Sequence, residues 1–303
     1  MRIALIGYGE VGRILAEDLR SHGDAVAAFD LKRESDAGTA LRTHAGRHGL
    51  VWADSHAAAV RDAELVVSAV TASQAVAVAR SCAPGLARGA FFLDLNSASP
   101  GAKIEAAGIV DTAGGRYVEG AVMTSVPPYR IRVPLLLGGE HASALEPLLN
   151  GLGFAAKVSS NQLGVASATK MCRSVMIKGL EAMVIEAYTT ARHYGVEDAV
   201  LASLKETFPG IDWEKQGAYI FQRVIEHGRR RSEEVREVAV TVREAGLEPW
   251  SAAGTAERQA WVADLADRGV FGGKEEGGFA RSADWRIEAD RILVQRKAKG
   301  AGR

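Results

Sequence analysis

A stripe of polar side chains runs through an otherwise apolar helical segment at residues 165–185. Its members are Ser167, Lys170, Ser174, Lys178 and Glu181, spaced three or four residues apart. This spacing places them on one helix face, which we expect to line a cleft between two domains. Partial burial there would lower the pKa of a lysine and suit it to general acid/base chemistry near neutral pH. The residues alone do not choose between Lys170 and Lys178, and they also allow lysines that extend out of a buried helix or pair with Glu181.

A glycine-rich turn supplies the second chemical signal. The sequence Gly7-Tyr8-Gly9-Glu10-Val11-Gly12 directly follows an apolar run and precedes an amphipathic segment. Gly7 permits a tight turn, Gly9 lets the backbone approach a pyrophosphate, and Gly12 allows close packing of helix and strand. The helix N-terminus then offers unpaired N–H groups to an anion. The pattern predicts a dinucleotide-binding turn.

Three further positions belong to this predicted cofactor site. Asp30 ends the second apolar run, 18 residues after Gly12, where its carboxylate can accept hydrogen bonds from an adenosine ribose. It favours NAD over NADP, although Lys32 and Arg33 could neutralise a 2′-phosphate. Val70-Thr71 and Asn96-Ser97 follow two later runs, at carboxyl ends of strands, where doubly wound sheets bind ligands.

The elements that position these residues follow from hydrophobic periodicity. Short apolar runs alternate with amphipathic stretches up to residue 158, which predicts a parallel sheet covered by helices on both faces. After the capping residues 159–161, one helical stretch continues to Gly195, and the remainder is helical with breaks at 209–210, 246–249 and 269–278. We therefore predict an α/β Rossmann domain at 1–158 and an all-α domain at 159–303, joined by a long interdomain helix. The predicted strands are 2–7, 25–30, 50–52, 64–70, 91–95, 117–123 and 133–138.

Composition excludes several classes of function. The chain has 303 residues, with 37 basic and 37 acidic side chains, so no net field favours nucleic acid or an anionic membrane. No stretch is long and apolar enough to span a bilayer, and two distant cysteines fit a reducing, cytoplasmic location. His44 and His48 stand at i and i+4, but Gly46 interrupts them and no third ligand is evident, so we expect no metal ion.

The motifs resemble those of the β-hydroxyacid dehydrogenase and 6-phosphogluconate dehydrogenase superfamily. The resemblance rests on Gly7–Gly12, on Asp94-Leu-Asn-Ser-Ala-Ser-Pro100 and on Gly164-Val-Ala-Ser-Ala-Thr-Lys170-Met, and it extends over the whole chain. It implies a Rossmann domain, a long interdomain helix and an all-α domain through which two copies dimerise. It also implies that Lys170 is the catalytic lysine.

Other residues are assigned by the same resemblance. Asn96 and Ser97 match the family's pair that contacts the nicotinamide ribose, and Ser174 matches its asparagine four residues after the lysine. The family's substrate loop, Val-Ser-Gly-Gly, falls on Val122-Met123-Thr124-Ser125, where the serine is lost and two hydroxyls follow. The acid of phosphogluconate enzymes is replaced by Ile177, which argues against that particular activity.

A basic segment in the second domain, His227 to Glu234, resembles a poorly characterised branch of the superfamily. His227, Arg231 and Glu234 share one helix face, and Arg231 could hold a substrate carboxylate with two parallel hydrogen bonds. The alternative is a solvated basic surface with local ion pairs.

Together these features predict an NAD(P)-dependent oxidoreductase that interconverts a β-hydroxyacid and its keto or semialdehyde form, with Lys170 as general acid/base. The substrate would contact Ser97, Met123, Thr124, Ser125, Lys178 and Arg231, with Ser174 beside the lysine. The alternatives are an imine reductase, a decarboxylating dehydrogenase of the same superfamily, and a dinucleotide-binding protein without catalysis.

Overall fold

The computed structural model describes residues 1–272, 274–275, 278–279, 282 and 284–300. The chain divides into two compact units, Met1–Cys172 and Arg173–Arg303, and the division falls inside helix α7 (Val165–Tyr194). Each unit has its own hydrophobic core. The domain boundary that the sequence places at residue 158 stays a prediction.

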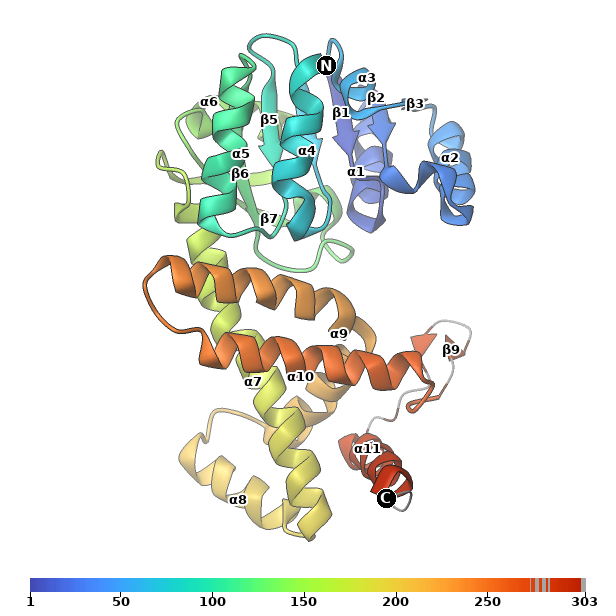
Figure 1. Ribbon diagram of the computed structural model, residues 1–303, viewed down its shortest axis with the longest axis vertical. Coiled ribbons are helices and arrows are strands. Elements are labelled where there is room, and N and C mark those ends of the chain that lie inside the picture. Colours follow the sequence, from blue (N-terminus) through green and yellow to red (C-terminus); the bar gives the residue numbers. More distant parts are fainter. Residues whose placement is uncertain (273, 276–277, 280–281, 283, 301–303) are drawn as a thin grey trace. The chain divides into compact units, whose positions relative to one another are not determined.

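The first unit is built on an eight-stranded sheet in the order β3-β2-β1-β4-β5-β6-β7-β8 (Figure 1). All neighbouring strands are parallel except β6 and β7. The strands are β1 (Arg2–Ile6), β2 (Ala25–Phe29), β3 (Val51–Trp52), β4 (Leu65–Ser68), β5 (Phe91–Asp94), β6 (Arg116–Val122), β7 (Pro134–Gly138) and β8 (Ala155–Ser160). The predicted Rossmann-like α/β fold is confirmed.

Strand β8 is absent from the sequence prediction. It lies at the edge of the sheet, and exposed and buried residues alternate along it, so it lacks the continuous apolar run of a central strand. Its last residue, Ser160, accepts a hydrogen bond at Oγ from the backbone N–H of Gln162 at 3.0 Å. Helix α7 consequently begins at Val165 rather than at Asn161.

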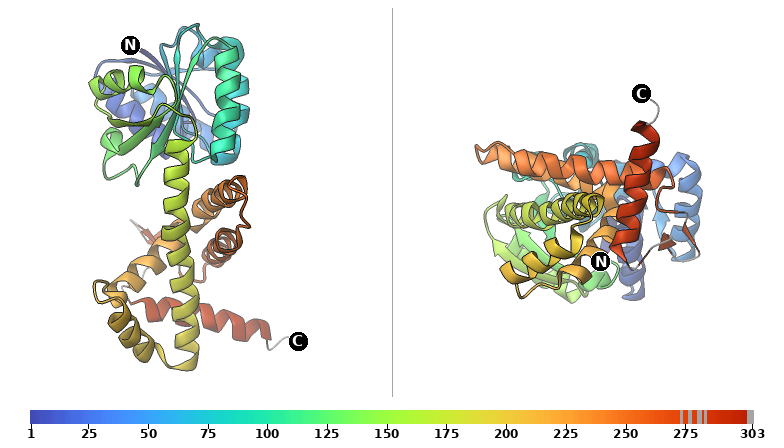
Figure 2. Two further views of the ribbon diagram at one scale, coloured as in Figure 1. Left: turned by 90° about the vertical axis from the view of Figure 1, so that its left-hand side faces the viewer. Right: turned by 90° about the horizontal axis from the view of Figure 1, so that it is seen from below.

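Helices cover both faces of the sheet, as Figure 2 shows. The helices of this unit are α1 (Glu10–Ser21), α2 (Asp36–Arg47), α3 (His56–Val60), α4 (Ala75–Cys82), α5 (Pro100–Thr112) and α6 (Ala142–Gly151). Two separate cores result, one containing residues of α1, α2 and α6 and the other residues of α3, α4 and α5. Strand β1 contributes Ile3 and Leu5 to the first core and Ala4 and Ile6 to the second, because side chains alternate along a strand.

The second unit is helical apart from a pair of two-residue strands. Its elements are the remainder of α7, α8 (Glu197–Thr207), α9 (Trp213–Glu244), α10 (Trp250–Asp267), α11 (Trp285–Gly300), β9 (Lys274–Glu275) and β10 (Gly278–Phe279). Gly195, Gly246 and Gly269 adopt positive φ where α7, α9 and α10 end, at three of the four places where the sequence predicts helix ends. Strands β9 and β10 lie in the predicted glycine-rich break. Helix α11 extends to Gly300, and residues 301–303 lie outside the described part of the chain.

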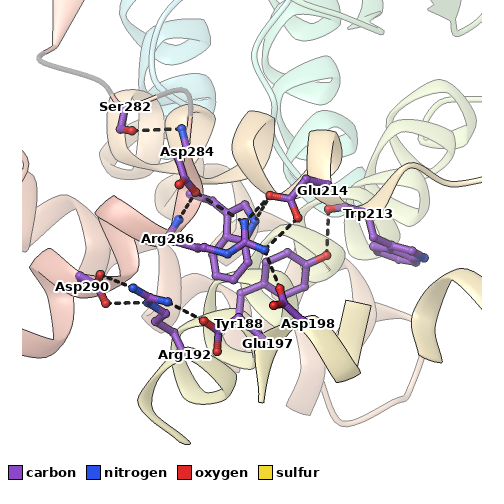
Figure 3. Close-up of polar contacts among 11 residues, drawn as sticks. Tyr188, Arg192, Glu197, Asp198, Trp213, Glu214, Ser282, Asp284, Arg286 and Asp290 are labelled. Carbon is purple, nitrogen blue, oxygen red and sulfur yellow. Dashed lines mark hydrogen bonds and ion pairs between the residues drawn. The ribbon is translucent and has the colours of Figure 1, made fainter. Parts of the chain in front are cut away.

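Ion pairs join the helices of the second unit (Figure 3). Arg192 of α7 donates to both carboxylate oxygens of Asp290 in α11, at 2.8 Å each, and contacts Glu197 of α8 at 2.5 Å. Arg286 bridges Asp198 of α8 and Glu214 of α9. Among the described residues, no helix is both long and apolar enough to cross a membrane.

Replacing Trp285 by alanine should destabilise this unit strongly. Its side chain is 1% exposed, packs against Tyr188 and Phe221, and donates from Nε1 to Glu214 at 3.0 Å. We expect Trp285→Ala to lower the free energy of unfolding by about 3–5 kcal/mol, measured by urea denaturation. Trp250→Ala, at a site that is 82% exposed, is the control and should change it by less than about 0.5 kcal/mol. Equal losses in the two variants would contradict this account of the core.

Candidate functional site

The turn between β1 and α1 requires glycine at two positions. Gly7 has φ +91°, and a Cβ there would lie 2.4 Å from the carbonyl oxygen of Ala69. A Cβ on Gly12 would lie 2.2 Å from the carbonyl oxygen of Gly7. A residue with a side chain at position 7 would therefore clash with the chain that follows β4, and one at position 12 would clash with the turn itself.

Gly9 differs, because a Cβ built on it would meet no atom within 4 Å. It is the N-cap of α1, and no side chain caps the helix there. The first backbone N–H groups of the helix, including those of Glu10 and Val11, therefore have no N-cap side chain to accept from them at the positive end of the helix dipole. This arrangement fits a pyrophosphate group.

Asp30 lies beside this turn at the end of β2. Its Oδ2 accepts a hydrogen bond from the backbone N–H of Tyr8 at 2.7 Å, and its Oδ1 accepts one from the backbone N–H of Lys32 at 2.8 Å. The carboxylate is thus oriented by the turn itself. The side chain of Tyr8 is fully buried against Trp52, which raises the pKa of Tyr8 to about 12, so only its backbone faces the predicted dinucleotide site.

Asn96 connects the carboxyl ends of β4 and β5. Its Oδ1 accepts from the backbone N–H of Val70 at 2.6 Å, and its Nδ2 donates to Ser68 Oγ at 2.9 Å. The structure therefore brings together the predicted residues Val70 and Asn96, with Thr71 next in the chain. Because both ends of the Asn96 amide are hydrogen-bonded to residues at the end of β4, Asn96 holds the ends of β4 and β5 together. Any contact that it makes with a ligand would be additional to this structural role.

A buried ion pair lies beneath Asn96, and sequence analysis did not identify it. Lys103 Nζ contacts Asp94 Oδ1 at 2.9 Å and also donates to the Asp94 carbonyl, and both side chains are 1% exposed. Tyr117 donates to Asp94 Oδ2 at 2.7 Å, and the Asn96 N–H donates to Oδ1 at 2.8 Å. Burial and the charge of Asp94 raise the pKa of Tyr117 well above its usual range. The sequence does carry one sign that Lys103 is buried, because this lysine shares the apolar face of α5 with Ala106, Ala107 and Val110.

Lys170 lies within the first unit and reaches the end of β5. Its Nζ donates to Ser97 Oγ at 2.6 Å, across 73 residues of sequence. Both residues are half-buried. The contact joins the predicted catalytic lysine to the predicted ligand-binding segment that follows β5.

Glu119 fixes the start of the helix that carries Lys170. This fully buried carboxylate accepts from the Ala166 N–H at 3.0 Å and from Ser167 Oγ at 2.8 Å. Negative charge at a helix N-terminus is stabilising. Ser167 of the polar stripe therefore helps to attach the start of α7 to β6 through Glu119. Gly138 is required beside it, because a Cβ there would lie 2.3 Å from Glu119 Oε1. The sequence prediction also missed Glu119.

The predicted substrate loop follows β6. Met123 is half-buried, whereas Thr124 and Ser125 are exposed within their unit. Arg130, which has φ +53°, anchors the far end of the loop by donating to Asp18 Oδ1 from Nε at 2.9 Å and from Nη2 at 2.7 Å. The two hydroxyls are therefore presented by a loop with a fixed base.

The remaining predicted site residues belong to the second unit and are buried. Arg231 donates through Nε to Glu181 Oε2 at 3.0 Å, and its Nη2 contacts the same carboxylate. Lys178 Nζ lies 2.7 Å from Glu234 Oε2; burial lowers the pKa of Lys178, and Glu234 opposes that shift. Ser174 is also buried. A substrate carboxylate at Arg231 would have to replace Glu181, and the predicted cleft between the domains stays a prediction.

The sheet order, the glycine turn and the acid after β2 define a dinucleotide-binding domain. The family model described as the NAD binding domain of 6-phosphogluconate dehydrogenase matches residues 2–158, more than half of the chain. The chain belongs to this family, and its cofactor is NAD or NADP. A second model, described as a domain of unknown function, matches residues 191–262.

Solved structures agree with this assignment. A conserved hypothetical protein from Sinorhizobium meliloti is 41% identical, with 86% of this chain and 87% of that one covered and a TM-score of 0.72. A conserved protein of unknown function, described as structurally similar to 3-hydroxyacid dehydrogenases, is 27% identical, with coverage of 88% and 99% and a TM-score of 0.68. Mycobacterium tuberculosis 3-hydroxyisobutyrate dehydrogenase is 16% identical, with coverage of 96% and 98% and a TM-score of 0.66, and it shares the fold.

Gly9→Ala should weaken dinucleotide binding without unfolding the protein. The added methyl group meets no protein atom, but it enters the space in front of the α1 N-terminus. We expect the Kd for NADH or NADPH to rise about tenfold or more, measured by fluorescence titration, with little change in Tm. Gly108→Ala, on α5 and equally free of contacts, should leave the Kd unchanged. An unaltered Kd in Gly9→Ala would place the pyrophosphate elsewhere.

Proposed function

We propose that the protein interconverts a β-hydroxyacid and its keto or semialdehyde form, with Lys170 as general acid/base. The observation that carries this proposal is the 2.6 Å contact between Lys170 Nζ and Ser97 Oγ. It puts an ammonium group at the carboxyl end of β5, the edge of a doubly wound sheet at which ligands bind.

The residues of the first unit would hold the cofactor. The N-terminus of α1 between Gly7 and Gly12 would take the pyrophosphate, and Asp30 would take the adenosine ribose. When bound, the nicotinamide accepts a hydride from the substrate carbon or returns one to it. We further propose a preference for NAD: Arg33 contacts Glu34 at 2.7 Å and Asp54 at 2.9 Å, so it is already paired with carboxylates and less suited to a 2′-phosphate.

Lys170 would handle the proton. In the oxidative direction its neutral amine accepts the proton of the substrate hydroxyl, and in the reductive direction its ammonium returns that proton. The Ser97 hydroxyl occupies the kind of position that a substrate hydroxyl would take, since it already accepts a hydrogen bond from Nζ. Ser97 would thus orient Lys170 before the substrate binds.

The other predicted residues would bind the substrate. Thr124 and Ser125 would hold its acid group, with Met123 at the pocket edge and Ser174 one helical turn beyond Lys170. Lys178 is paired with Glu234, and Arg231 is paired with Glu181. To bind the substrate, each would exchange this carboxylate for the acid group of the substrate. We also propose a homodimer formed through the second domain, for which the family resemblance is the support.

Lys170→Ala tests the proposed acid/base role. We expect kcat to fall about 10²- to 10⁴-fold while the Kd for NADH stays unchanged, because the lysine acts on the substrate proton. A screen of hydroxyacids with NAD and NADP in parallel, followed by cofactor absorbance, first identifies the substrate. Lys157→Ala, an exposed lysine on β8, is the control and should keep full activity. Near-normal turnover in Lys170→Ala would refute the assignment.

Asp30→Asn tests the cofactor preference. Removing the negative charge should reduce repulsion of a 2′-phosphate, so the ratio of kcat/KM for NAD over NADP should fall about tenfold. Asp36→Asn, an exposed acid on α2, should leave the ratio unchanged. A ratio that does not move in Asp30→Asn would mean that another residue sets the preference.

A further inference from the structure

Two histidines and a glutamate meet on the surface of the first unit, apart from the proposed catalytic residues. Glu17 comes from α1, His44 from α2, and His48 is the residue that caps the C-terminus of α2. One potential ligand atom from each lies within 4.8 Å of the other two, and all three side chains are half-buried. The sequence shows only the histidine pair, and the fold supplies the third residue.

We propose that Glu17, His44 and His48 form a binding site for a divalent transition metal of the Zn²⁺ type. Two imidazoles and one carboxylate are a common donor set for Zn²⁺, with water completing the tetrahedron. His44 Nε2 lies 3.0 Å from Glu17 Oε1, close to the roughly 3.3 Å that separates two ligands in a tetrahedron with metal bonds of about 2.0–2.1 Å. The His48 ring stacks on His44 with centroids 4.5 Å apart, and its ligand nitrogen lies within 4.8 Å of the ligand atoms of Glu17 and His44.

The outer atoms of two of these ligands are held by neighbouring residues. Tyr8 Oη lies 3.0 Å from His44 Nδ1, and Arg130 Nη2 donates to Glu17 Oε2 at 2.7 Å. Ligands of metal sites usually have such partners, which orient the ring and the carboxylate. Arg130 occupies only Oε2, so Oε1 remains directed toward His44.

The hydrogen bonds allow His44 to change tautomer without a net change in protons. In the tautomer with its proton on Nε2, His44 would donate to Glu17 Oε1 and accept at Nδ1 from the Tyr8 hydroxyl. When the metal binds, the Nε2 lone pair coordinates it, and the proton is carried on Nδ1 and donated to Tyr8 Oη. A phenol hydroxyl can both donate and accept, so Tyr8 is compatible with either state.

The site would fasten α2 to α1 next to the glycine turn. Tyr8 belongs to that turn, and its buried ring contacts both Trp52 and His44. Metal binding should therefore stabilise the first unit, because a ligand that binds only the folded state raises its stability. This inference does not depend on the proposed acid/base role of Lys170.

Zn²⁺ titration of the full-length protein tests the site. After removal of any affinity tag and treatment with EDTA followed by desalting, calorimetry should show one Zn²⁺ per chain. Co²⁺ should give the visible absorption of a tetrahedral complex, and Zn²⁺ should raise Tm. His48→Gln and Glu17→Gln should each weaken Zn²⁺ binding at least tenfold, and Tyr8→Phe should weaken it about tenfold.

His193→Gln, which changes an exposed histidine of the second unit, is the matched control and should bind Zn²⁺ as the wild type does. Circular dichroism melts without metal confirm that each variant is folded. Absence of saturable binding would overturn the proposal. Binding that His48→Gln and Glu17→Gln leave unchanged, or that His193→Gln abolishes, would overturn it as well.

Discussion

The buried carboxylate of Asp94 is the constraint on which the candidate site depends. A charge that is 1% exposed is stable only when it is fully paired, and here Lys103, Tyr117 and the Asn96 N–H all bind it. These bonds fix the chain just after β5. Through Asn96 they set the end of β4, and through Ser97 they set the hydroxyl that contacts Lys170. Loss of Lys103 would leave an unpaired buried charge, which typically costs about 3–5 kcal/mol.

A second buried acid does the same for the lysine itself. Glu119 on β6 is the register partner of Asp94 on β5, and it binds the N-terminus of α7. Two adjacent carboxylates on the central strands β5 and β6 therefore determine where Ser97 and Lys170 lie. The polar groups that meet there are held by buried structure rather than by surface loops.

The sequence was sufficient for features that depend on local patterns. Continuous apolar runs predicted the central strands, and the glycine turn with Asp30 predicted the dinucleotide-binding fold. Strand β8 was missed because a half-exposed edge strand has no such run. The partners Lys103, Glu119 and Glu17 were missed for another reason: each is paired with a residue distant in sequence, and periodicity carries no information on long-range pairing. Lys103 alone left a local trace, as a charge on an apolar helix face.

The partners of the polar stripe also bear on which lysine acts as the base. From the residues alone, Lys170 and Lys178 were equal candidates. Lys178 is paired with the carboxylate of Glu234, which favours the protonated ammonium, but burial is the larger effect and lowers the pKa of Lys178. Lys170 donates to the hydroxyl of Ser97, at the carboxyl end of β5. Our proposal that Lys170 is the base rests instead on its place in the fold: it reaches Ser97 after β5, within the unit that carries the glycine turn, whereas Lys178 belongs to the second unit.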